Sequence, residues 1–231
     1  METRLARALV LMLTVTALFS GRALAQQSER SQHARINYVV TIITSGVDHF
    51  WQANGRMPYS MDELYQAGML PKNLRNPITG NDLDLYAQSP AVGEFVYTWS
   101  DEQHATFLFT DADNSTSEVP IDVSHDSVTT IPQPDFVLSL YQTWGVLALQ
   151  TYYMVTKQIP TSLSDLQDAG YWPFTDEKNP ITGENLDFYT DKPGNIAFRF
   201  RADRVYVYAC TSDGGNTIAL LDPAQQTWLQ D

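Results

Sequence analysis

The sequence predicts an α+β protein made of two tandem copies of one unit, each a long N-terminal helix packed on a small antiparallel sheet of three to four strands. Two blocks of sequence carry this prediction. Residues 57–68 (MPYSMDELYQAG) recur as 159–170 (IPTSLSDLQDAG). Residues 76–86 (NPITGNDLDLY) recur as 179–189 (NPITGENLDFY), with 8 of 11 positions identical. Because the two blocks keep nearly the same spacing, they indicate a repeated structural unit.

The first 25 residues have the composition of a secretion leader. Arg4 and Arg7 precede an apolar run over residues 8–19, and Ala23-Leu24-Ala25 supplies the small residues that a signal peptidase reads. A membrane-spanning helix needs about 20 apolar residues, which is longer than this run. We therefore expect residues 1–25 to be a cleaved signal peptide and the mature chain to be exported to the periplasm or the extracellular space. An uncleaved anchor is the alternative.

Each unit is expected to begin with a long helix. Apolar residues recur at steps of three and four along residues 36–51 and again along 137–155, which places them on one helix face. Asn54-Gly55 has the composition of a helix C-terminus. With these helices as starting points, unit 1 covers residues 26–123 and unit 2 covers residues 136–231.

Two polar segments lie outside the helices and sheets of this scheme. Residues 124–135 contain Pro132 and Pro134 among polar neighbours, which is the composition of a linker. Residues 26–35 are polar as well and are expected to form a flexible lead-in to the first helix.

A short capped helix is predicted after each long helix. Ser60 can accept a hydrogen bond from the amide of Glu63, and the Glu63 carboxylate can reach back to Ser60, as in a capping box. Ser162 and Asp165 repeat this arrangement in unit 2. A glycine follows each of these helices and is expected to end it.

The repeated NPITG motif is predicted to form a fixed turn that delivers the chain to the sheet. Proline sets φ at the start of a turn, and glycine can adopt positive φ at its end. The residues given this structural role are Asn76, Pro77, Gly80, Asn179, Pro180 and Gly183. A ligand-binding loop is the alternative interpretation of the same motif.

Short runs of apolar, aromatic and β-branched residues predict three strands in each unit, the first two joined as a hairpin. The predicted strands are 95–99, 106–109 and 119–123 in unit 1, and 196–200, 205–209 and 217–221 in unit 2.

The composition excludes some functions and leaves others open. The chain has 27 acidic and 14 basic residues and a net charge of −13, so it offers no basic stripe for nucleic acid or anionic lipid. Twelve tyrosines, ten phenylalanines and five tryptophans are enough for folded cores rather than a disordered acidic tail. Cys210, the only cysteine, excludes an internal disulfide. It is either a buried thiol or an intermolecular bridge.

No motif indicates catalysis, so we expect a protein that is not an enzyme and uses no organic cofactor. The sequence has no nucleophile elbow, no phosphate-binding loop after a predicted strand, and no histidine pair at metal-binding spacing. Two other classes stay open. The first is a secreted carbohydrate or small-ligand binding module that uses exposed tryptophans, the candidates being Trp51, Trp99, Trp172 and Trp228. The second is a hydrolase whose site forms only between the units.

The order of these elements resembles the globular part of type II secretion pseudopilins and related type IV pilin-like proteins. The resemblance rests on short motifs in both units: Asn54 to Pro58, Leu64, Gly68 and Asn76 to Gly80, then Ile159-Pro160, Leu163, Leu166, Gly170 and Asn179 to Gly183. It implies a structural or protein-interaction role at the cell envelope, with protein partners and a possible link to a type II secretion or pilus-like system.

The start of the mature chain departs from this family. A pseudopilin keeps a hydrophobic helix after processing, and that helix builds the filament core. Here the apolar run precedes the expected cleavage site, and the polar stretch 26–30 follows it. The resemblance therefore implies a soluble derivative without a stable membrane anchor, which lacks the helix that pilins use to enter a filament.

Calcium is the one metal for which the acidic loops could supply ligands. Asp111 and Asp113 follow the second strand of unit 1, and Asp213 follows that of unit 2. Calcium takes six to eight oxygen ligands from flexible loops. The major pseudopilin has a calcium site in its equivalent loop, so the resemblance implies a possible site here. Solvated turn residues are the alternative.

Overall fold

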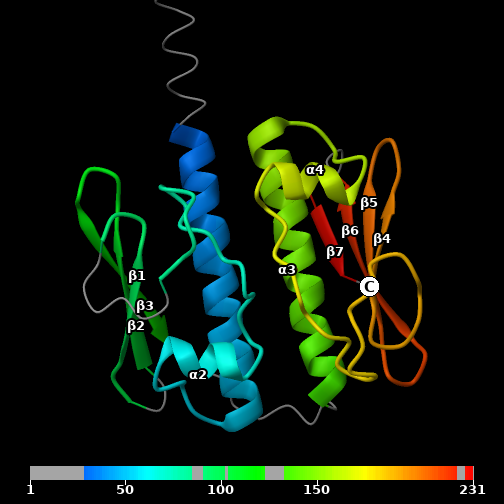
Figure 1. The fold of residues 1–231 in the computed structure, drawn as a ribbon, viewed down its shortest axis with the longest axis horizontal. Coiled ribbons are helices and arrows are strands. Elements are labelled where there is room, and N and C mark those ends of the chain that lie inside the picture. The colour runs from blue at the N-terminus through cyan, green and yellow to red at the C-terminus, as the bar shows by residue number, and fades with distance from the viewer. Residues whose placement is uncertain (1–28, 85–90, 102–103, 123–132, 223–226, 231) are drawn as a thin grey trace, which may run out of the picture.

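Two long helices lie side by side in the middle of the molecule, and an antiparallel sheet covers the outer side of each (Figure 1). The computed structural model describes residues 29–84, 91–101, 104–122, 133–222 and 227–230. The first long helix occupies residues 29–54, and the second, α3, spans Gln133–Thr156. They run in opposite directions, which gives four layers in the order sheet, helix, helix, sheet.

The first half continues from its long helix through a short helix to a three-stranded sheet. Helix α2 spans Met61–Gln66, and strands β1 (Phe95–Trp99), β2 (His104–Thr110) and β3 (Thr116–Asp122) pair in the order β1-β2-β3. The second half repeats this order with α4 (Leu163–Asp168), β4 (Ile196–Phe200), β5 (Val205–Cys210) and β6 (Asn216–Asp222). Strand β7 (Thr227–Gln230) pairs with β6 as a fourth strand.

The α+β class and the antiparallel sheets are therefore confirmed. Strands β2 and β3 begin two and three residues earlier than predicted, because the polar residues at their starts complete the antiparallel ladder from His104↔Asp122 to Thr110↔Thr116. The predicted signal peptide (1–25) and most of the predicted linker lie outside the described residues.

Two boundaries of the helices were predicted wrongly. Residues 29–35, expected to be a flexible lead-in, are helical, and Ala34 is buried there. Residues 133–135, expected to end the linker, form the first turn of α3. Pro134 does not prevent this, since the first turn of a helix does not need the proline amide for an intrahelical bond.

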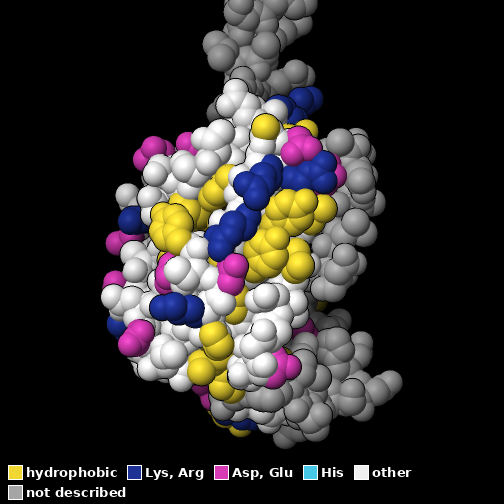
Figure 2. All heavy atoms as spheres, turned by 90° about the vertical axis from the view of Figure 1, so that its right-hand side faces the viewer, with side chains coloured by type: hydrophobic (Ala, Val, Ile, Leu, Met, Phe, Trp, Pro, Cys, Tyr) yellow, Lys and Arg dark blue, Asp and Glu magenta, His cyan; other side chains and the backbone are white. Residues whose placement is uncertain are grey.

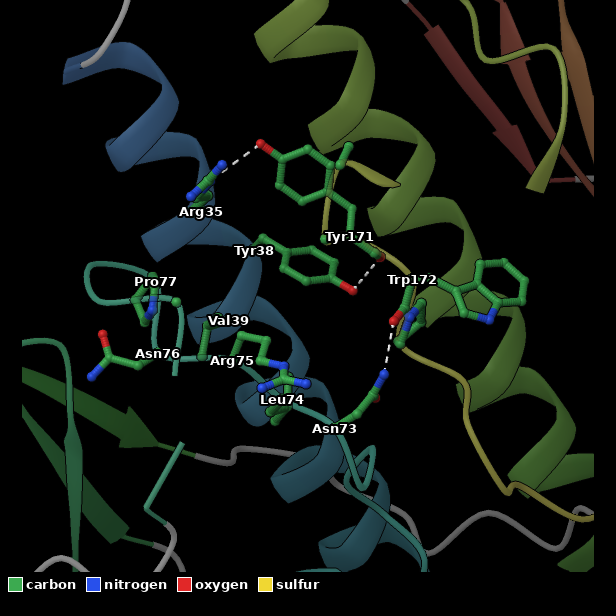
Figure 3. Close-up of a pocket in the computed structure, with 14 residues that line it drawn as sticks. Arg35, Tyr38, Val39, Asn73, Leu74, Arg75, Asn76, Pro77, Tyr171 and Trp172 are labelled. Carbon is green, nitrogen blue, oxygen red and sulfur yellow. Dashed lines mark hydrogen bonds between the residues drawn. The ribbon is translucent and has the colours of Figure 1, made fainter. Parts of the chain in front are cut away.

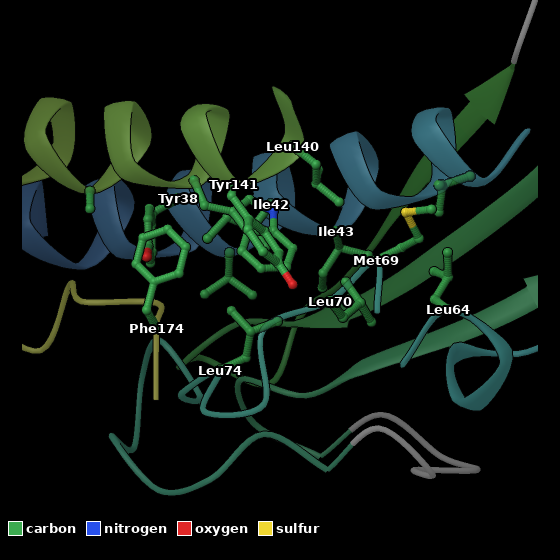
Figure 4. Packing of buried hydrophobic residues seen from close by; sticks show 14 of the residues in the cluster. Tyr38, Ile42, Ile43, Leu64, Met69, Leu70, Leu74, Leu140, Tyr141 and Phe174 are labelled. Carbon is green, nitrogen blue, oxygen red and sulfur yellow. The ribbon is translucent and has the colours of Figure 1, made fainter. Parts of the chain in front are cut away.

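One continuous apolar core extends across both halves (Figure 4). The first long helix contributes Ile42 and Ile43, which are fully buried, and α3 contributes Leu140 and Trp144, which are also fully buried. A unit of about 80 residues buries too little surface for a robust core of its own. Packing the two helices together supplies the missing burial, so the halves stabilise each other.

Hydrogen bonds between residues 90 or more positions apart also join the halves. The Tyr38 hydroxyl donates to the carbonyl of Tyr171 over 2.8 Å, and their rings meet edge to face at 6.1 Å. The seam is the contact between the two long helices. Near its other end, His49 Nε2 lies 3.3 Å from the Ser139 hydroxyl. Among the residues that the structure describes, none of the helices has the length and apolar character of a membrane span.

Candidate functional site

A pocket of about 120 Å³ lies between the two halves (Figure 3). Three segments form it: the first long helix, the turn segment 73–80 of the first half, and residues 169–173 after α4 in the second half. Its fourteen lining residues are Arg35, Tyr38, Val39, Asn73, Leu74, Arg75, Asn76, Pro77, Gly80, Ala169, Gly170, Tyr171, Trp172 and Pro173.

Tyr38 fixes one wall of this pocket. Its side chain is buried, and its hydroxyl is held by the bond to the Tyr171 carbonyl. Burial raises the pKa of Tyr38 far above its ordinary value, and the neighbouring Tyr171 adds to this effect. The side chain is therefore a neutral, positioned hydroxyl and not a source of charge.

The charged residues that line the pocket are both basic and both exposed, although the whole chain carries −13. The lining contains Arg35 and Arg75 and no aspartate or glutamate. Arg35 donates through Nε to the Tyr171 hydroxyl at 3.5 Å, and its guanidinium lies 5.9 Å from the centre of that ring. Arg75 forms an ion pair with the exposed carboxylate of Asp82. Within the described part of the chain, Arg35 has no carboxylate partner.

Asn73 contributes an unsatisfied acceptor to the lining. Its Nδ2 donates to the carbonyl of Trp172 over 3.0 Å, which fixes the orientation of the side-chain amide (Figure 3). The other end, Oδ1, is buried and has no hydrogen-bond partner within the described residues. A buried acceptor without a donor is costly and uncommon in folded proteins. Because this oxygen is shielded from solvent, an N–H or O–H of a ligand in the pocket can reach it only when neighbouring side chains move.

A second pocket, of about 360 Å³, repeats this construction with the halves exchanged. It combines α3 and the turn segment of the second half with the end of α2 and the segment after it in the first half. Its lining residues are Tyr65, Gln66, Gly68, Leu70, Lys72, Tyr141, Asp176, Glu177 and Lys178. Reciprocal contacts of this kind are those of an interface with two-fold symmetry. The two halves are therefore related by an approximate two-fold axis.

Backbone bonds align the turn segments of the two pockets. The amide of Leu83 donates to the carbonyl of Leu74 over 2.9 Å, and the amide of Leu186 donates to that of Glu177 over 3.1 Å. This alignment makes three pairs of positions equivalent in the two halves: Leu74 and Glu177, Asn73 and Asp176, and Arg75 and Lys178. The second pocket thus has two carboxylates at positions where the first has an amide and an apolar side chain.

The two NPITG segments are turns built around the asparagine. Oδ1 of Asn76 accepts from the amides of Ile78 (3.0 Å) and Thr79 (2.9 Å), and the Gly80 amide donates to the Asn76 carbonyl. Asn179 makes the equivalent bonds in the second half. Asn76, Pro77 and Gly80 also line the first pocket, whereas the lining of the second includes none of their counterparts Asn179, Pro180 and Gly183.

The acidic loop residues are engaged within their own turns. Asp111 Oδ1 accepts from the Ala112 amide, Asp113 Oδ1 accepts from the Ser115 amide, and Asp213 Oδ1 accepts from the Gly215 amide. Hydrogen bonds from Ser115 lower the pKa of Asp113, and a bond from the neighbouring Thr211 hydroxyl lowers the pKa of Asp213. In the ranges that the structure describes, no three His, Cys, Asp or Glu side chains converge on one point. Calcium binding stays a prediction, tested by the calcium dependence of the melting temperature.

The tryptophans proposed for carbohydrate binding have different environments. Trp51 is buried and Trp172 is half-buried, whereas Trp99 is 39% exposed. Trp99 packs edge to face against Tyr59, with ring centres 5.3 Å apart. The side chain of Trp228 lies outside the described residues. An edge-to-face pair does not offer a single flat platform of the kind that stacks on a sugar.

Comparisons of the chain with protein families, with curated protein sequences and with solved structures give no match. Sequence reasoning also missed the charged and polar lining of the first pocket, namely Arg35, Asn73, Arg75 and Tyr171. These residues come from two halves about 100 positions apart, and no local motif connects them. The usable signal was the difference between the copies, since the turn motifs match while the residues just before them do not.

Proposed function

We propose that this chain is an exported, pilin-like double module that acts by binding other proteins at the cell envelope. The feature that supports a pilin-like unit is its construction, a long helix packed on a small antiparallel sheet, with a capped helix and an asparagine turn between them. This construction occurs in both halves. It agrees with what the resemblance to pseudopilin globular domains implies.

The observation that carries the interaction role is the outer face of the second sheet (Figure 2). On β5, Val205 and Val207 face the core, so Tyr206 and Tyr208 face outward. On β6, Ile218 pairs with Tyr208 and lies on the same outer face. Arg199, Leu220 and these three residues are only half-buried, and they form what we call the outer patch. Tyrosine and arginine are enriched in protein interfaces.

The first sheet offers a matched surface of different character. The outward positions of β2 are occupied by Thr106 and Leu108, which correspond to Tyr206 and Tyr208 of β5. Most apolar residues of both long helices are buried in the core that the helices form with each other and with the sheets, although Met154 on α3 is 49% exposed. We therefore expect partners to contact the outer patch rather than the helices or the first sheet.

Photo-crosslinking in cells tests this proposal. A photoreactive phenylalanine analogue at Tyr208 is expected to give adducts with envelope proteins, while the same analogue at Leu108 gives few or none. Mass spectrometry of the N-terminus is expected to find a chain that starts at Gln26 in the periplasmic or extracellular fraction. A chain that keeps residues 1–25 in the cytoplasm, or equal crosslinking from both positions, would contradict the proposal.

A further inference from the structure

We propose that the first inter-half pocket binds a small organic carboxylate that carries its own N–H or O–H donor. This inference goes beyond protein binding through the outer patch, and it depends on different residues. It rests on three properties of the lining: the sign of its charge, the unsatisfied acceptor and the size of the space.

The charge selects an anion. Arg35 and Arg75 are the charged residues of the lining, in a chain with nearly twice as many acidic as basic residues. Guanidinium groups bind carboxylates through two parallel hydrogen bonds. Arg35 uses its Nε for Tyr171, and its terminal nitrogens have no carboxylate partner among the described residues. Arg75 shares its charge with Asp82, whose side chain is 84% exposed, so that ion pair is weak.

The unsatisfied acceptor selects a donor on the same ligand. Asn73 Oδ1 is buried, unpaired and held in place by the bond from Nδ2 to Trp172. An inorganic anion that presents only acceptor oxygens would leave this atom unsatisfied. A hydroxyl or an amide N–H would satisfy it, as in a hydroxy acid or an N-acylated amino acid.

The space and its walls limit the rest of the ligand. A volume of about 120 Å³ is small beside the roughly 300–1,000 Å³ of typical ligand pockets. Most of the lining is apolar, with Val39, Leu74, Pro77 and Pro173 around the polar groups. This combination favours a ligand with a short apolar body of a few carbon atoms.

The second pocket is a control built into the same chain. Its position equivalent to Asn73 is Asp176, and its position equivalent to Leu74 is Glu177. Carboxylates at these positions repel an anion and offset the charges of Lys72 and Lys178, which line the same pocket. The same backbone arrangement is therefore expected to bind the ligand in one pocket and not in the other.

Ligand-observed NMR on the chain without residues 1–25 tests the inference. The probes are lactate, N-acetylglycine and salicylate, each compared with its uncharged amide and with inorganic sulfate, which has no O–H donor at neutral pH. At least one carboxylate is expected to bind, at least tenfold more tightly than its amide. Arg35→Gln and Asn73→Asp are expected to weaken that binding at least tenfold, while Lys178→Gln in the second pocket changes it less than twofold.

Three results would overturn the inference. These are no binding by any of the three carboxylates, equal binding of sulfate, and equal loss from Lys178→Gln and Arg35→Gln. Circular dichroism and thermal melting of each variant separate loss of the pocket from loss of the fold. As a second measurement, the indole N–H resonance of Trp172 is expected to shift on binding in the parent chain and in Lys178→Gln, but not in Asn73→Asp. None of these results changes the crosslinking expected at Tyr208, which tests the outer patch separately.

Discussion

Replacing the turn asparagines with aspartate is expected to have very different effects in the two halves. In the first half, Asn76 Nδ2 donates to the carbonyl of Val92 and to Glu94 Oε1, both at 2.9 Å. In the second half, Asn179 Nδ2 donates to the carbonyl of Pro193 and to Asn195 Oδ1, again at 2.9 Å. Aspartate keeps the acceptor Oδ1 in both turns and replaces this donor with an anionic oxygen.

The structure gives the size of the difference. Asn179→Asp loses two neutral hydrogen bonds, each worth about 1 kcal/mol net, so it is expected to cost about 2 kcal/mol. Asn76→Asp loses two bonds as well and places a second carboxylate beside Glu94. Two unit charges 4 Å apart repel by about 4 kcal/mol at an effective dielectric constant of 20. Relaxation of the half-buried Glu94 side chain reduces this value, and we expect an excess cost of at least about 2 kcal/mol.

Urea unfolding and thermal melting at pH 7 measure this difference. An excess of about 2 kcal/mol corresponds to a melting temperature roughly 4–8 °C lower for Asn76→Asp than for Asn179→Asp. The gap is expected to shrink as the pH falls below about 5, because two adjacent carboxyl groups share a proton and the repulsion then disappears. Asn81→Asp, an exposed change in the same first turn, is the control and should cost less than about 0.5 kcal/mol. Equal losses from the two variants at pH 7, or a gap independent of pH, would refute this reasoning.

Three further predictions concern single positions. Gly93→Ala and Gly194→Ala are each expected to lower the melting temperature strongly. The reason is that φ is positive at both positions and an added Cβ would lie 2.0 and 1.9 Å, respectively, from the carboxamide oxygen of the turn asparagine. Gly68→Ala is the control, with positive φ but open space around it, and should cost only about 1 kcal/mol. Cys210 is buried and burial raises the pKa of its thiol, so a thiol reagent should react with it only in denaturant, and reaction in the native state would contradict the assignment. Burial lowers the pKa of His49 below its ordinary value of 6.5, so the unfolded state binds the proton more readily than the folded state. The contribution of His49 to stability should therefore be full above pH 6.5 and fall as the pH drops below it. Urea unfolding at pH 7.5 and 5.5 measures this dependence, and His49→Gln should remove it.

Local chemistry made much of each half predictable from the sequence. Ser60 caps α2 by accepting from the Glu63 amide at 3.2 Å, as the capping motif predicts. The Glu63 carboxylate, however, accepts from the amide of Tyr59 and from Arg56 rather than from Ser60. The nearby guanidinium was not visible in the four-residue motif. A motif therefore located the cap, and a neighbour outside the motif decided its hydrogen bonds.

The end of α3 shows a second limit of motif reasoning. The first long helix is followed by Gly55 in the left-handed conformation, which the sequence predicts. In the second half Lys157 takes that conformation, with φ of 57°. The Lys157 amide donates to the Tyr153 carbonyl over 2.8 Å, as the Gly55 amide does to Trp51 over 2.7 Å, so the helix end keeps its backbone bond without the glycine. The strands were easier to predict, because alternation along β5 and β2 is set by one buried face.

The pocket between the halves was beyond reach of these local rules because it depends on the seam. Its walls come from three segments whose relative position is fixed only when Tyr38 reaches Tyr171 and Asn73 reaches Trp172. The rotation of each long helix about its own axis decides which residues face the other half. The spacing of apolar residues along the sequence does not fix that rotation to better than one residue position. Sequence periodicity therefore predicted the buried face, and the identity of the pocket residues needed the structure.

The approximate two-fold relation between the halves explains why their differences carry functional information. Two equivalent units share the requirements of the fold, so the asparagine turns, the capped helices and the buried helix faces are retained in both. Where equivalent positions differ in charge, as Asn73 and Asp176 do, the fold does not require the same residue in both halves. The same holds for the outward pairs Leu108 and Tyr208. Both proposals depend on these differing positions, one inside the seam and one on the outer sheet, and for this reason each can be tested against its own counterpart in the same molecule.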